Sequence, residues 1–122
     1  MIATEQQKSK KESISVLEEC VGLQERKSLD YQNPMSRIRQ ADHYPNGVQT
    51  ITDMAYQKLI RAYSLLDTIR DNPAAEPQFE NLEDSYIDAI NYLSFAVSYI
   101  RGAMDGQDIT ERDIFNRLIV RD

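Results

Sequence analysis

The chain has little of the chemistry on which many functional sites depend. It contains a single cysteine, Cys20, which excludes an internal disulfide and a cysteine-based zinc cluster. Its single histidine, His43, leaves little for a histidine metal cage or a Ser-His-Asp triad. No apolar run approaches the roughly 18 residues of a membrane span, and the N-terminal residues are too polar for a signal peptide. We therefore expect a cytoplasmic protein that does not contact membranes.

What is present is typical of one globular domain. The 122 residues are 41% hydrophobic and 28% charged, with only four glycines and four prolines. The net charge of −6 repels phosphate backbones, so general DNA or RNA binding is not expected. With one histidine and one cysteine available, a metal site has to be built from carboxylates, which favour Mg²⁺ or Mn²⁺.

Hydrophobic periodicity predicts an all-α fold, since no segment alternates as a strand. Amphipathic stretches predict helices from about residue 14 to Leu29, from Thr50 to just before Asp71, and over Leu82–Arg101, where Gly102 ends the third helix. A short C-terminal helix is expected from Asp108 or Thr110.

Helix caps and turns set the expected boundaries. Thr50 and Asp53 fit a capping box, and Asn81 fits an N-cap. Turn signals between residues 30 and 50 predict a functional loop, with room for a short helix over 36–42. We expect one compact helical bundle over 1–122, with a frayed segment 1–11, a helical core 12–102 and a C-terminal helical extension 103–122.

The third helix has two sides that need an explanation. One side is an ordinary core stripe, formed by Tyr86, Ala89, Ile90, Leu93, Ala96, Val97 and Ile100. The opposite side carries Asp84, Asp88, Asn91, Phe95 and Ser98, flanked by Ile87, Tyr92 and Tyr99. A helix that is apolar nearly all round is buried on both sides, so we expect a loop or another subunit to cover the second side. This favours a homo-oligomer, most simply a dimer.

Two charged pairs on the predicted helices are candidates for chemistry. Asp84 and Asp88 are spaced i, i+4, so they repel each other unless a divalent cation binds them. The alternative is that both acids stabilise the helix N-terminus through the helix dipole. Lys58 and Arg61 are spaced i, i+3 and could contact phosphate or could be solvated cations.

Several motifs occur in a familiar order: Asp30-Tyr31, Lys58-x-x-Arg61 followed by Ser64-Leu65-Leu66, and the closing run Leu82–Tyr92. Over about residues 14 to 102 the chain resembles the nucleotide modification associated domain 1 family, which is common in phages. That family is similar to the all-α nucleoside triphosphate pyrophosphatases of the MazG and dimeric dUTPase group. The resemblance implies a MazG-like fold and Mg²⁺-dependent hydrolysis of (d)NTPs to monophosphate and pyrophosphate, in the host cytoplasm if the chain is phage-encoded.

The resemblance also implies roles for individual residues. It assigns metal binding and catalysis to Glu19, Asp84 and Asp88. It assigns nucleotide or phosphate binding to Lys27, Asp30, Tyr31, Lys58, Arg61, Asn91 and Tyr92. The chain departs from the family pattern at Gly22, where a second helix-one acid is expected, and at Gln32 and Gln57.

Three functions follow from these residues. The first is a Mg²⁺-dependent (d)NTP pyrophosphohydrolase. The second is a non-catalytic protein of nucleotide metabolism that binds or sequesters a nucleotide as a helical oligomer, which Gly22 favours. The third is a structural helical protein whose acids are capping groups. His43 could stack on a base, accept a proton or be a plain surface residue.

Overall fold

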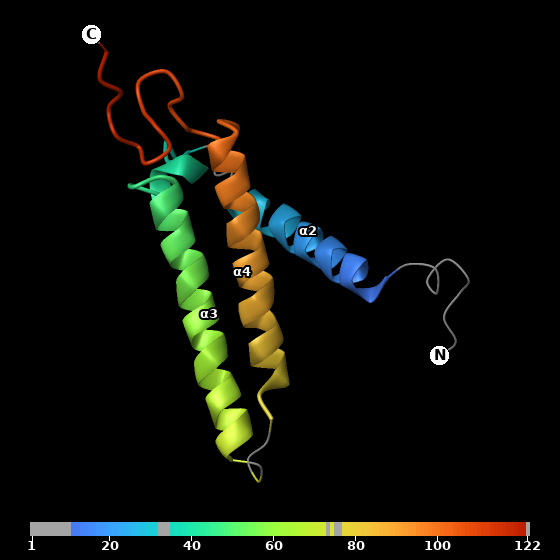
Figure 1. Ribbon diagram of the computed structural model, residues 1–122. Helices are drawn as coiled ribbons and strands as arrows, with labels where there is room; N and C mark the ends of the chain where they lie inside the picture. The colour runs from blue at the N-terminus through green and yellow to red at the C-terminus, as the bar shows by residue number, and fades with distance from the viewer. Residues whose placement is uncertain (1–10, 32–34, 73, 75–76, 122) are drawn as a thin grey trace. The chain divides into compact units, whose positions relative to one another are not determined.

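The computed structural model describes residues 11–31, 35–72, 74 and 77–121 (Figure 1). Its elements are helix α2 (Glu12–Tyr31), the 3-10 helix η1 (Gln40–His43), helix α3 (Val48–Asp71) and helix α4 (Phe79–Ile100). The described part contains no β-strand, so the predicted all-α class is confirmed. None of the described helices combines the length and the apolar character needed to cross a membrane.

The chain divides into two compact units, residues 1–36 and residues 37–122. The first unit contains α2, which extends slightly beyond the predicted helix at both ends. The second unit contains η1, α3, α4 and the C-terminal segment. The expected fraying of the N-terminal segment falls on residues 1–10, outside the described residues, and on Lys11.

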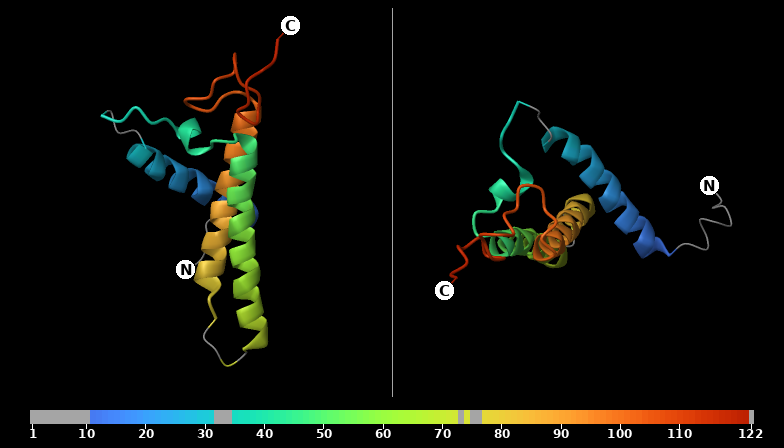
Figure 2. Two further views of the ribbon diagram at one scale, coloured as in Figure 1. Left: turned by 90° about the vertical axis from the view of Figure 1, so that its left-hand side faces the viewer. Right: turned by 90° about the horizontal axis from the view of Figure 1, so that it is seen from above.

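In the second unit, α3 and α4 lie side by side and run in opposite directions, as the views in Figures 1 and 2 agree. Ala55 and Ala62 of α3 and Ala89 and Ala96 of α4 are buried. Because the distance between packed helices depends on the side chains at the contact, these alanines allow close approach. The two helices therefore form a tight hairpin.

A cluster of buried hydrophobic residues lies at the end of the hairpin where α3 begins and α4 ends. Its buried members are Ala41, Tyr44, Ile51, Ala96, Tyr99 and Met104, and the half-buried Val48, Met54, Tyr92 and Phe95 pack against it. The Tyr92 and Phe95 rings meet edge to face, with centroids 6.1 Å apart. Residues before α3 and after α4 therefore help to hold the two helices together.

The start of α3 differs from the prediction. The helix begins at Val48 with Gly47 as its N-cap, so the expected capping box at Thr50 and Asp53 is wrong. The Thr50 hydroxyl accepts a hydrogen bond from the Asn46 backbone N–H at 2.9 Å, and Asp53 accepts one from the Gln49 side chain. The Val48 N–H donates to the Ile114 carbonyl at 2.9 Å, so the C-terminal segment takes the place of a side-chain cap.

Gly47 is required by this arrangement. Its φ of 58° and ψ of −129° belong to a region that residues with a side chain rarely adopt. A Cβ atom at this position would lie 2.2 Å from the Ile114 carbonyl oxygen. Glycine is therefore needed both for the backbone conformation and for the close approach of the C-terminal segment.

The start and end of α4 were predicted unequally well. The helix begins at Phe79, three residues before the expected Leu82, and its N-cap is Gln78 in place of Asn81. It ends at Ile100, and Gly102 follows with a φ of 69°, which confirms the predicted glycine stop.

The expected C-terminal helix is wrong, because residues 103–121 form turns and one isolated bridge between Arg112 and Leu118. An Asp108 carboxylate oxygen accepts hydrogen bonds from the Thr110 and Glu111 backbone N–H groups at 3.1 and 2.9 Å. One from Asp113 accepts from the Phe115 and Arg117 N–H groups, both at 2.9 Å. Such local acceptors satisfy the backbone without a helix. These backbone hydrogen bonds also lower the pKa of both carboxyl groups.

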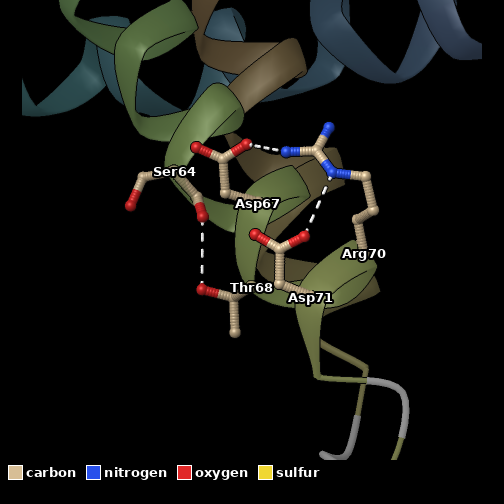
Figure 3. A network of polar contacts seen from close by, with 5 residues as sticks. All are labelled: Ser64, Asp67, Thr68, Arg70 and Asp71. Carbon is tan, nitrogen blue, oxygen red and sulfur yellow. Dashed lines mark hydrogen bonds and ion pairs between the residues drawn. The ribbon is translucent and has the colours of Figure 1, made fainter.

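The last turns of α3 carry an exposed charge network, shown in Figure 3. The Arg70 guanidinium contacts the Asp67 carboxylate and, at 3.3 Å, that of Asp71. The Thr68 hydroxyl donates to the Ser64 carbonyl at 3.2 Å. Exposed pairs of this kind are screened by solvent, so the network adds little to the stability of the hairpin.

Candidate functional site

An ion pair joins the two helices of the hairpin at the predicted site. The Lys58 Nζ atom on α3 lies 3.0 Å from the Asp88 Oδ2 atom on α4, and the two side chains are 29% and 28% exposed. The resemblance placed Lys58 on phosphate and Asp88 on a metal ion. In the structure each neutralises the other, so the lysine ammonium supplies the positive charge that the carboxylate needs.

The remaining predicted residues of the hairpin lie close to this pair by helix geometry. Arg61 is three residues from Lys58 on α3, and Asp84 is four residues from Asp88 on α4, so each pair shares a helix side. Arg61 and Asp84 are exposed, whereas Asn91, the next residue of the α4 stripe, is 7% exposed. We refer to Lys58, Arg61, Asp84, Asp88 and Asn91 as the polar face.

The burial of the two sides of α4 differs from the prediction. Of the expected core stripe, only Ala89 and Ala96 are buried. Tyr86, Leu93, Val97 and Ile100 are exposed. The opposite side of α4, for which the sequence predicted a covering loop or subunit, is the more buried of the two. Asn91 and Tyr99 are buried there, and Phe95 and Ser98 are half-buried.

A similar apolar stripe is exposed on α3. Successive residues turn by about 100° around a helix, so on both helices the exposed large hydrophobic residues lie roughly opposite the polar-face residues. The Lys58–Asp88 pair fixes both polar stripes on one side of the hairpin. The two apolar stripes therefore share the other side. We call this the apolar face and define it as Tyr56, Leu59, Ile60, Tyr63, Phe79, Tyr86, Leu93, Val97 and Ile100.

The other predicted site residues are not joined to this cluster by a described contact. Glu19 and Lys27 are exposed on α2. Asp30 and Tyr31 are the last two residues of α2, and their side chains, like residue Gln32, lie outside the described part. Tyr92 packs against the hydrophobic cluster, so its ring has a structural role in the second unit. His43 ends η1 and is exposed.

The departure at Gly22 lies in the middle of α2. A Cβ atom at this position would meet only the Arg26 Nη1 atom within 4 Å, at 3.6 Å, which is ordinary van der Waals contact. A larger residue therefore fits, and tight packing does not explain the glycine.

The carboxylates of the described residues are dispersed. Within that part of the chain, no group of three or more His, Cys, Asp or Glu side chains is arranged to hold a metal ion. Two carboxylates on one helix remain, and Mg²⁺ often binds through one or two carboxylates together with substrate phosphates. Asp84 and Asp88 are the two carboxylates of the polar face, and Asp88 is paired with Lys58.

The sequence analysis identified the α4 stripe of the apolar face but expected it to be buried, and it did not connect this stripe with the exposed residues of α3. Phe79, Tyr86, Leu93 and Ile100 recur every seven residues along α4. A seven-residue repeat of large apolar residues is typical of a helix that packs along another helix. Alanines at the buried positions Ala89 and Ala96 indicate a second, closer contact with α3.

Comparisons with protein-family models, curated protein sequences and solved structures found no match for this chain.

Proposed function

We propose that this chain is a nucleotide-binding protein of nucleotide metabolism, of the Mg²⁺-dependent (d)NTP pyrophosphohydrolase type. The observation that supports the proposal is the Lys58–Asp88 ion pair on the polar face. In this pair Lys58, the residue expected to bind phosphate, contacts Asp88, the residue expected to bind a metal ion. Arg61 and Asp84 lie one helical turn away on their respective helices.

The pair has a direct consequence for binding. A triphosphate would draw Lys58 and Arg61 to its oxygens, where the arginine can form two parallel hydrogen bonds. Asp88 would then lose its cation. Asp84 and Asp88 would hold Mg²⁺, which supplies charge neutralisation on the phosphates. Nucleotide and Mg²⁺ are therefore expected to bind together, each replacing one half of the ion pair.

A second candidate is nucleotide binding without cleavage. Two observations favour it: Gly22 stands where the resembled family has an acid, and the Lys58 ammonium neutralises the Asp88 carboxylate. In that case the lysine stays on the carboxylate, and Arg61 carries the phosphate contact alone.

Calorimetric titration with the four dNTPs, with and without Mg²⁺, tests both candidates. Binding that needs Mg²⁺ and is followed by pyrophosphate release supports the hydrolase. Binding that is independent of Mg²⁺, without release, supports the binding protein. Absence of binding by every dNTP under both conditions overturns the proposal and leaves the structural helical protein. The matching deoxynucleosides are the control, because they lack the phosphates that Lys58 and Arg61 would contact.

A further inference from the structure

The apolar face is large for a surface left in water. Its nine side chains are 41% to 65% exposed, and Tyr63 is the most exposed of them. A fully exposed aromatic side chain presents about 150 to 250 Å². If the aliphatic side chains are given a similar area, these fractions correspond to roughly 700 to 1,100 Å² of surface on one side of the hairpin. This is about the area, near 800 Å², that each partner contributes to a stable protein–protein interface.

The composition of the apolar face is that of an interface core. Four of its nine members are aromatic, and none is charged. Aromatic residues are enriched at the centres of interfaces, and charged residues are depleted there. The charged residues beside the apolar face are of both signs, since Asp53, Asp67 and Glu83 are accompanied there by Arg70 and Arg101. Interfacial helices bind anionic lipids through a side rich in lysine and arginine, which these mixed charges do not supply, and the net charge of −6 opposes such binding.

The spacing of the apolar residues indicates what covers them. The repeat of seven along α4, from Phe79 to Ile100, suits packing against another helix over the length of α4. On α3, Tyr56, Leu59, Ile60 and Tyr63 continue the same surface at i, i+3, i+4 and i+7. Two helices presenting one flat apolar side match a second hairpin of the same kind, which would complete a four-helix arrangement.

We propose that the apolar face is the surface through which two copies of this chain associate. The interface is isologous, with the same nine residues on both sides. Because the polar face lies on the opposite side of the hairpin, Lys58 and Arg61 of each copy stay outside this interface. The association therefore does not depend on the proposed nucleotide site, and each copy keeps its own Lys58–Asp88 pair.

Sedimentation of the full chain without nucleotide tests the interface. The unaltered protein should sediment at twice the mass of one chain at micromolar concentration. Its melting temperature should fall on dilution, because association with a second copy stabilises the folded chain by mass action. A single-chain mass with a melting temperature independent of concentration overturns the proposal, and it would mean that the face is covered within the chain, for example by the apolar residues of α2.

Neighbouring substitutions on α3 locate the interface. Tyr63→Glu places a charge on the apolar face, whereas Ser64→Glu places the same charge on an exposed neighbour outside it. Tyr63→Glu should raise the dimer dissociation constant by at least about 30-fold, the scale of a hot-spot change. Ser64→Glu should change it by less than about threefold.

Leu93→Glu on α4 provides a second, independent variant. Leu93 is exposed in the single chain, so its substitution should leave the helical circular dichroism unchanged while producing monomers. A dimer that survives both Tyr63→Glu and Leu93→Glu assembles through another surface, and the proposal is then wrong whatever the nucleotide titrations show.

Discussion

In an ordinary amphipathic helix the apolar side is buried and the polar side is exposed. In the α3–α4 hairpin, the central residues of the polar face are more buried than the residues of the apolar face. On the polar face Asn91 is buried, and Lys58 and Asp88 are about three-quarters covered. On the apolar face Leu93 and Ile100 are half exposed or more. The free energy gained by burying apolar surface is about 25 cal/mol per Å², so leaving such a face in water forgoes a large stabilisation. The hairpin therefore satisfies its buried polar groups and exposes much of its apolar surface.

The two faces differ in how strictly they select a binding partner. A buried polar group needs a partner with the correct geometry, and no buried side-chain nitrogen or oxygen atom of the described residues lacks a hydrogen-bond partner. An apolar face requires only a complementary shape, because hydrophobic burial is non-directional. Substitutions on the polar face should therefore change ligand binding or stability according to the individual group. Those on the apolar face should act mainly through association.

The largest expected effect is on phosphate binding at the polar face. Arg61→Ala should weaken triphosphate binding by roughly 1.5 to 3 kcal/mol, the scale of a hydrogen bond to a charged group. The free energy of unfolding should stay within about 0.5 kcal/mol, because Arg61 is exposed. Calorimetric titration and urea unfolding measure the two quantities. Arg70→Ala is the control, since Arg70 contacts Asp67 and Asp71 at the end of α3 and should leave binding unchanged.

A reciprocal exchange on α4 compares the two faces directly. Asn91→Leu should lower the free energy of unfolding by about 1 to 3 kcal/mol, because the groups that satisfy the buried amide would lose their partner. Leu93→Asn should lower it by less than about 1 kcal/mol in the single chain, mainly through helix propensity. Both are measured by urea unfolding in the Tyr63→Glu background, which keeps the chain monomeric. A larger loss for Leu93→Asn would show that the apolar face is buried within one copy.

The next expected effect concerns α2. Gly22→Glu should raise the free energy of unfolding by roughly 0.5 to 1 kcal/mol, since glutamate suits a helix interior better than glycine and Arg26 lies one turn further on. Gly22→Ala is the control for propensity without charge. If Glu19 binds metal, as the resemblance implies, Gly22→Glu should also tighten Mg²⁺-dependent dNTP binding relative to Gly22→Ala. Equal binding by the two variants would assign α2 no part in metal binding.

The smallest expected effect is the energy of the ion pair itself. A double-mutant cycle with Lys58→Met and Asp88→Asn should give a coupling energy of about 0.2 to 1 kcal/mol, because both groups are partly exposed and screened by solvent. Raising the salt concentration should reduce this coupling. A coupling indistinguishable from zero at low salt would mean that the pair does not hold Lys58 in place before a ligand binds.

Sequence patterns predicted the helices of the hairpin but not which of their sides is buried. The period of 3.6 residues and Gly102 sufficed for the body and end of α3 and for the end of α4, but not for the start of either helix. The buried side of α4 was assigned wrongly, because Tyr86, Leu93 and Ile100 form a regular stripe of large side chains and a single sequence does not say whether such a stripe faces its own chain. The C-terminal helix was wrong because Asp108 and Asp113 bind backbone amides locally, and a capping box and an aspartate-supported turn begin with similar residues.

The sequence indicated which charged residues share a helix side, but it did not predict which of them contact each other across the hairpin. The spacing of Lys58 and Arg61, and that of Asp84 and Asp88, placed each pair on one helix side. The contact between Lys58 and Asp88 depends on the antiparallel register of α3 against α4. That register follows from the alanine positions and from the cluster around Ile51 and Tyr99, which depend on packing across the loop between the helices.

The join between Gly47 and the C-terminal segment bears on the order in which the chain folds. The Asn116 side chain donates a hydrogen bond to the Pro45 carbonyl, 71 residues away, while the Val48 amide is bonded to Ile114. Contacts between distant residues carry a loop-closure cost and form more slowly than local ones. We therefore expect most of α3 to form early against α4, and its first turn to become stable only when the segment around Ile114 and Asn116 has docked. Amide exchange at Val48 would then report the arrival of the C-terminal segment, while exchange at mid-helix amides would report the hairpin alone.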